Sequence, residues 1–109
     1  MLRASSPKFG VVAQLAGIKD LSVDVGVIGA RFIMAAADAA VLRDDIELVD
    51  ARAQLVAELG EAAAARTFAV AGNFEMMNRL LDALGVGPMG PTAKLAEELG
   101  IEVPTHFAN

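Results

Sequence analysis

The sequence predicts an all-α fold, a small helical bundle of four to five helices in which a long helix of the C-terminal half lies at an oligomer interface. Apolar residues recur at helical spacing through most of the chain. Asp, Gly and Pro stand where these helices should begin or end. The 109 residues are 55% apolar and only 21% charged, so charged side chains cover little of a small domain's surface. We therefore expect a single helical domain over residues 1–109, with part of its apolar surface buried against another chain.

The first segment predicts a short helix followed by a connection. Ser5 and Ser6 supply a helix N-cap, and Pro7 is favoured in a first turn. Apolar residues at helical spacing then continue up to Gly17. Residues 18–26 alternate apolar and polar side chains, but a strand there would have nothing to pair with, so we interpret them as a connection.

Residues 25–42 form the second predicted helix. Its apolar side chains advance by four and three residues and line one side, namely Ile28, Phe32, Ala35, Ala39 and Leu42. Arg31 and Asp38 interrupt this helix, and about 10.5 Å along the axis separates them, too far for an easy contact. We expect each side chain to extend to solvent, the alternative being a partner elsewhere.

The third predicted helix covers residues 46–59 and ends at Gly60. Either Asp44 or Asp45 can cap it, and Glu47 stands where a capping box would place it relative to Asp44. Two faces fit burial equally well: Val49, Ala53 and Val56, or Leu48, Leu55 and Leu59.

The longest predicted helix covers residues 61–84, which is about 36 Å at ~1.5 Å per residue. Gly85 followed by Val86 is typical of a left-handed C-cap with an apolar follower, and Pro88 prevents continuation. A short C-terminal helix is expected within residues 91–101.

Beyond that helix, Gly100 and Ile101 repeat the same stop signal. The tail, residues 102–109, has no periodicity, so we expect it to be frayed or to lie on a neighbouring subunit.

The long helix is apolar on two sides. Large side chains gather on one side, namely Val70, Phe74, Met77, Leu81 and Leu84, and mostly small ones on the other, including Ala62, Ala65, Ala69 and Gly72. A helix that is apolar nearly all round should be buried nearly all round, at the centre of a bundle or an oligomer interface. The small residues would let another helix approach closely. A ligand groove is the alternative.

Polar residues of this helix fall into two groups. Asn73 lies within the apolar arc, where its amide should find a backbone or cross-subunit partner, or else recognise a ligand. Glu75, Arg79 and Asp82 stand at i, i+4 and i+7, so Arg79 can reach either acid. We interpret these three as a solvated face, with an intersubunit anchor at Arg79 as the alternative.

Composition argues against several functional classes. The chain has no cysteine, so it has no thiol nucleophile, disulfide or thiolate metal ligand. Its net charge of −5 and its five aromatic residues, all Phe, argue against nucleic-acid binding. No uncharged apolar run approaches the ~18 residues of a membrane span, and we expect a cytoplasmic protein. The single histidine, His106, has no second ligand nearby, so we assign no catalytic, metal-binding or cofactor-binding residue and no cofactor.

The stretch "AGNFEMMNRLLDALGV" resembles the C-terminal helix of carboxymuconolactone decarboxylase-like proteins of the alkylhydroperoxidase D type. The motif positions are Asn78-Arg79, Asp82-Ala83 and Gly85-Val86, and the resemblance covers residues 45–86, more weakly from residue 27. It implies an all-helical fold that oligomerises through long helices. In the peroxidase members an upstream Cys-x-x-Cys or Cys-x-x-His segment carries the chemistry, and this sequence has no such segment. The resemblance therefore assigns no catalytic residue here. The positions that match the family's structural motif are Asn73, Asn78, Arg79 and Asp82.

We therefore expect a non-catalytic, self-associating helical protein, an enzyme being the less favoured interpretation. The alternatives are a small-molecule-binding protein, a cysteine-independent decarboxylase-like enzyme, or a partner subunit of a separate cysteine-bearing chain. The expected interface or pocket residues are Arg31, Asp38, Gly72, Asn73, Phe74, Met77, Asn78, Arg79 and Asp82.

Overall fold

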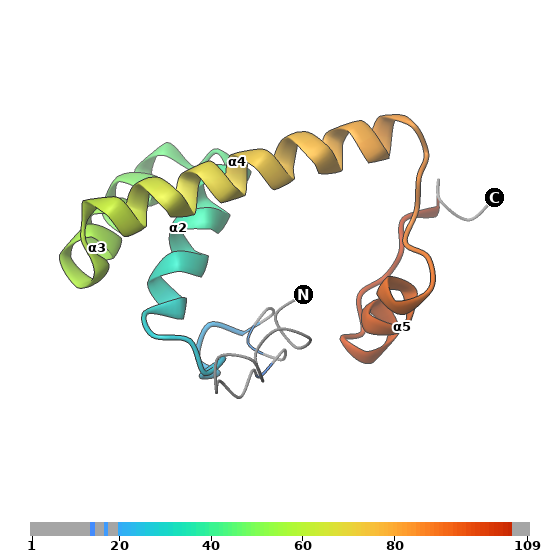
Figure 1. Ribbon diagram of the computed structural model, residues 1–109, viewed down its shortest axis with the longest axis horizontal. Coiled ribbons are helices and arrows are strands. Elements are labelled where there is room, and N and C mark those ends of the chain that lie inside the picture. The colour runs from blue at the N-terminus through green and yellow to red at the C-terminus, as the bar shows by residue number, and fades with distance from the viewer. Residues whose placement is uncertain (1–13, 15–16, 18–19, 106–109) are drawn as a thin grey trace. The chain divides into compact units, whose positions relative to one another are not determined.

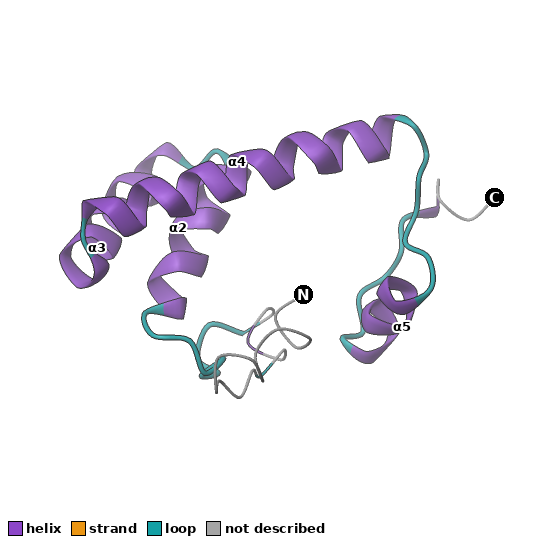
Figure 2. Ribbon diagram, viewed as in Figure 1, coloured by secondary structure: helices purple, strands orange, loops and turns teal. Residues whose placement is uncertain are grey.

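The computed structural model describes residues 14, 17 and 20–105. This part of the chain has four helices and no strand, as Figures 1 and 2 show: α2 (Ala30–Leu42), α3 (Asp45–Leu59), α4 (Glu61–Ala83) and α5 (Pro91–Glu98). The predicted all-α class is confirmed. The helix expected before Gly17 lies almost entirely outside the described residues, as does His106.

The chain divides into two compact units, residues 1–72 and 73–109, and the division falls inside α4. The organisation as a single domain stays a prediction.

Helix α2 begins later than the sequence predicted. The apolar spacing suggested a start near residue 25, but Gly26 and Gly29 have positive φ angles of 79° and 70°, and Gly29 is the N-cap. A Cβ built at Gly29 would lie 2.6 Å from Leu59 Cδ1, so this position also needs glycine for space. Residues 20–26 form turns and bends, which agrees with the predicted connection where the structure describes it.

Asp44 lies at the corner between α2 and α3 and forms hydrogen bonds with both helices. The Asp44 N–H donates to the Ala39 carbonyl at 3.0 Å and the Arg43 N–H to the Ala40 carbonyl at 3.3 Å, the pattern of a Schellman motif. The Asp44 carboxylate also accepts from the Glu47 N–H at 3.0 Å and caps α3. Asp44 is therefore the cap, and the expected capping box is only half formed because the Asp44 N–H is engaged by α2.

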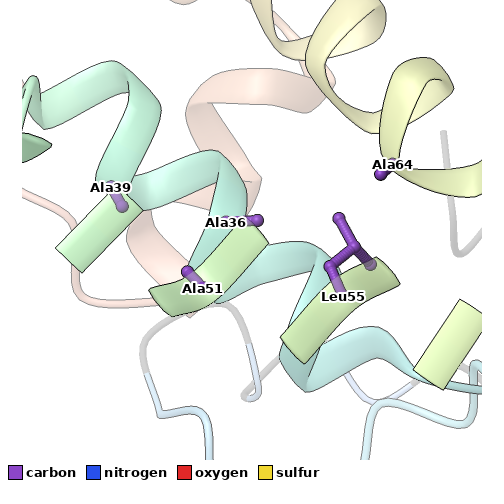
Figure 3. Close-up of a cluster of buried hydrophobic side chains, with 5 residues drawn as sticks. All are labelled: Ala36, Ala39, Ala51, Leu55 and Ala64. Atoms are coloured by element: carbon purple, nitrogen blue, oxygen red, sulfur yellow. The ribbon is translucent and has the colours of Figure 1, made fainter. Parts of the chain in front are cut away.

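The core of the first unit is built mainly from alanine. Its buried residues come from three helices, and Figure 3 shows the Leu55 side chain directed toward Ala64 of α4. Small side chains let α2 and α3 pack closely, and Leu55 is the one large side chain that is fully buried among the described residues. The cluster contains Ala36, Ala39, Ala51, Leu55 and Ala64.

The structure decides between the two faces proposed for α3. Leu55 is fully buried, and Leu48 and Leu59 are partly buried against the core. Val49 remains 68% exposed, but Val56 of the same predicted face is also partly buried against the core, so the inner side of α3 is centred on Leu55 and includes Val56.

Helix α4 is not buried all round within this chain. Only Ala64 and Thr67 are buried along its length, and the Thr67 hydroxyl donates to the Ala63 carbonyl at 2.9 Å. Within the single chain the burial is one-sided, because α2 and α3 reach only one side of the first half of α4. Burial of the remaining surface by another copy stays a prediction.

The glycine signals that predicted the ends of α4 and α5 are confirmed. Gly85, with φ 71°, follows α4, and the Val86 N–H donates to the Leu81 carbonyl at 2.9 Å. The same arrangement follows α5, where the Ile101 N–H donates to the Ala96 carbonyl at 2.8 Å. Both are Schellman motifs in which glycine supplies the left-handed residue.

Candidate functional site

The second half of α4 and the residue that follows it carry a row of large apolar side chains in contact with solvent, which we call the apolar face. At ~100° per residue, these side chains lie within about 60° of Met77 around the helix. Their exposed fractions range from 39% at Leu81 to 68% at Leu84. The apolar face consists of Phe74, Met77, Leu80, Leu81 and Leu84, all in the second unit.

The charged residues of the same segment gather on the opposite side of α4. Glu75, Arg79 and Asp82 lie about 140–200° from Met77 around the helix. Arg79 Nη2 and Glu75 Oε1 are 2.8 Å apart, so the predicted i,i+4 pair is present. The Arg79 side chain is 64% exposed, so this pair contributes little to stability, and the interpretation as a solvated face is supported.

Asn73 and Gly72 are both exposed within the single chain. The Asn73 amide therefore reaches water, and the chain itself does not create the buried amide that the sequence led us to expect. A Cβ built at Gly72 would meet no atom within 4 Å, so no other helix of the described chain approaches there. Close approach by a helix of another chain stays a prediction.

The second unit contains an open groove with a volume of about 790 Å³. It lies between the last turns of α4, the turn that follows and the start of α5. Three predicted site residues, Asn78, Arg79 and Asp82, line it together with Met89 and Thr92. All five are exposed, so water competes for every polar group in the groove.

Met89 and Thr92 were missed by the sequence reasoning because the linker carries no periodic pattern. The Gly-Pro turn signal before them indicates that the chain reverses, but not which side of α4 it returns along.

Arg31 and Asp38 belong to the first unit, and both are exposed. The Arg31 guanidinium lies 4.5 Å from the centroid of the Phe32 ring, an arrangement in which the aromatic face supports the charge. Arg31 also lines a smaller hollow of about 310 Å³, whereas Asp38 lines neither hollow. The two residues thus extend to solvent independently, as predicted.

The hollow of about 310 Å³ in the first unit is bordered by a turn that Asp20 stabilises. Its carboxylate accepts hydrogen bonds from the Ser22 hydroxyl at 2.6 Å and from the Ser22 N–H at 2.9 Å. These bonds lower the pKa of Asp20, the hydroxyl contributing most.

The first unit also exposes apolar residues outside its core, of which only Val49 belonged to one of the two predicted faces of α3. Val49 is 68% exposed and Ile46, three residues before it on the same side of α3, is 85% exposed. They belong to the α3 face that is not used for the core. Leu42, at the end of α2, is 75% exposed.

Comparison of the chain with protein-family models, with curated proteins and with solved structures finds no match.

The described residues contain no group of three or more side chains suited to hold a metal ion. Across the same residues, no helix combines the length and the apolar character required to cross a membrane. Every buried side-chain nitrogen or oxygen described has a hydrogen-bond partner.

Proposed function

We propose that this protein is a non-catalytic, self-associating helical protein and that the apolar face of α4 is its self-association surface. The observation that carries the proposal is the separation of side-chain types on α4. Between residues 73 and 84, five exposed large apolar side chains lie on one side of the helix and the three charged ones lie on the other, with Met76, 65% exposed, at the border between them. Continuous exposed apolar surface of this kind is typical of interaction sites.

The free energy that each side chain of the apolar face contributes to self-association follows from the area that it would bury. Each side chain of the apolar face is roughly half exposed. Complete burial of a large apolar side chain contributes about 1.5–3 kcal/mol, so covering the exposed half contributes about 1 kcal/mol per residue. A single substitution on this face is present in both copies of a dimer and removes about 2 kcal/mol, so it should change the dissociation constant about thirtyfold, which is measurable.

We further propose that the chain is related to the alkylhydroperoxidase D-like proteins and has kept their helical packing without their thiol chemistry. The support is the pattern Asn78-Arg79 with Asp82 in α4, and the absence of cysteine. The Gly85-Val86 step of the same motif ends α4 by a general physical mechanism, so it adds little weight to the family relationship.

Sedimentation equilibrium across a dilution series tests self-association. The expected result is an average mass of at least twice 11.3 kDa at high concentration, which falls on dilution. A mass of 11.3 kDa at every concentration would overturn the proposal and would favour a separate partner chain.

Two matched variants test the surface. Met77→Glu places a charge in the centre of the apolar face and should dissociate the oligomer, because an unpaired buried charge is strongly unfavourable. Ala65→Glu places the same charge at an exposed position about 120° away on the same helix and should leave the mass unchanged. Dissociation by Ala65→Glu alone would assign the interface to the small residues instead. Circular dichroism confirms that both variants keep their helices.

A second candidate function, binding of a small molecule, is favoured by the groove that places Asn78, Arg79 and Thr92 in one hollow. Native mass spectrometry of the purified protein tests it. A retained small molecule that disappears in Asn78→Ala would support binding there, whereas a ligand-free spectrum at the mass of the polypeptide would argue against it.

A further inference from the structure

We infer that the helices of the second unit open independently of the first unit and far more often, and that α4 divides at Gly72 when they do. By opening we mean loss of helical structure over the described part of the second unit, residues 73–105, while the alanine-rich core of the first unit stays folded. The inference concerns a single copy of the chain and goes beyond the proposed self-association.

The second unit has no buried residue in the part that the structure describes. Every buried residue of the described chain belongs to the first unit, and the last of them along α4 is Thr67. Burial of apolar side chains is the main favourable contribution to folding. The second unit therefore lacks the contribution that stabilises the first.

The helices of the second unit depend on local interactions. Residues 73–83 of α4 and the eight residues of α5 are both shorter than the ~12–15 residues that an isolated helix needs in water. The ion pair between Glu75 and Arg79 is exposed and adds little. Folded units of fewer than about 40 residues usually need disulfides, a metal or a partner. The chain has no cysteine, and its described residues hold no group suited to a metal.

Gly72 stands where a shortened α4 would end. The last described residue of α4 that packs against the core is Phe68, and Gly72 follows one turn later. A Cβ built at Gly72 would meet no atom within 4 Å, so no close contact in the described chain requires glycine there. Glycine weakens the interior of a helix and is the favoured residue just beyond a helix end. Both preferences favour the form in which α4 ends near Gly72.

Two exposed arginines allow the opening of the two units to be compared within one molecule. Arg52 in α3 and Arg79 in α4 have side chains that are 52% and 64% exposed, and their ion pairs with glutamate measure 2.9 Å and 2.8 Å. A protease binds its site in extended form. With dilute protease the cleavage rate of a helical site therefore follows the population of the open form. Trypsin cleaves after arginine, so the two sites differ chiefly in how often their helices open.

The full chain is digested with dilute trypsin, and the fragments that end at Arg52 or Arg79 are quantified by mass spectrometry. The expected result is cleavage after Arg79 at least about tenfold faster than after Arg52. Met77→Glu is digested in parallel, because it should not associate and glutamate has a helix propensity close to that of methionine. Equal rates at the two sites in Met77→Glu would overturn the inference, whatever sedimentation shows about self-association.

Gly72→Ala tests the boundary. Alanine fits the open space at this position and strengthens the helix. Cleavage after Arg79 should slow by about threefold to fivefold, while cleavage after Arg52 stays the same. Equal slowing at both sites would show that the two units open together, and an unchanged rate at Arg79 would overturn the role of Gly72.

Asn78→Pro tests independence from the opposite direction. Proline in a helix interior removes a backbone hydrogen bond and clashes with the preceding turn, so it breaks the second half of α4. If the units are independent, Arg52 stays as resistant to trypsin as in the wild-type chain. Loss of that resistance would show that the first unit depends on the second and would overturn the inference.

Discussion

At the scale of single residues, Arg43 is the clearest departure from local preference. It is the one residue other than glycine with a positive φ in the part of the chain that the structure describes, 58°, and it ends α2 where Gly85 and Gly100 end the later helices. An L-residue in this conformation costs roughly 1–2 kcal/mol, whereas glycine adopts it freely.

Arg43→Gly should therefore raise the free energy of unfolding. Part of the gain is offset by the greater freedom of glycine in the unfolded chain, about 0.4–1 kcal/mol, so the net increase should be on the order of 0.5–1 kcal/mol. Urea unfolding followed by circular dichroism measures it. Arg43→Ala, which keeps a Cβ, should show no such increase, and an equal gain there would contradict the explanation.

Asp44→Ala should lower stability by about 0.5–2 kcal/mol, because the Glu47 N–H loses its acceptor at the start of α3. Thermal unfolding of Asp44→Ala and of Asp45→Ala compares the two residues that the sequence offered as caps. Equal losses would show that the cap observed at Asp44 is not the source of the effect.

At the scale of helices, the residues at which a helix begins and ends were easier to predict than the face that it buries. Helices α3 and α4 begin and end within a residue of the sequence prediction, because Gly60 and Gly85 are local signals. The start of α2 was predicted too early, since Ile28 continues the apolar spacing across a backbone that Gly29 has already turned.

Which face of a helix is buried depends on its neighbours, and periodicity alone does not supply them. Both faces of α3 are apolar, and only the structure shows that Leu55 is inside and Val49 outside. The apolar face and the charged side of α4 followed from the sequence, whereas the contribution of Thr92 to the groove depends on the path of the linker.

Asn73→Leu should strengthen self-association. In the proposed oligomer the Asn73 amide is covered by an apolar partner surface, where an unsatisfied amide costs about 1–3 kcal/mol. The dissociation constant from sedimentation equilibrium should fall by about fivefold or more. Glu75→Leu, which adds a similar side chain on the charged side of α4, should not strengthen association to the same degree.

At the scale of the whole molecule, the chain has a small core and much exposed apolar surface. Leu55 alone among the large described side chains is fully buried, while the five residues of the apolar face are each at least 39% exposed. A core of this size contributes modest stability to a single copy.

Thermal stability should accordingly depend on protein concentration. Self-association adds free energy to the folded state by mass action, so the midpoint should rise over a roughly hundredfold increase in concentration. Differential scanning calorimetry at several concentrations measures it. Met77→Glu should have a midpoint that is independent of concentration, and a wild-type midpoint that never moves would contradict the role of association in stability.

The shared use of Asp44 also limits how this chain can change in length. Its N–H completes α2 and its carboxylate starts α3, so the joint contains no spare residue. An inserted residue there would detach one helix end and rotate α3 by ~100° relative to α2, which turns Leu55 away from the alanine cluster. No residue in 86–89 both completes the end of one helix and caps the start of the next. Lengthening by insertion is thus compatible with the fold after α4 and incompatible with it between α2 and α3.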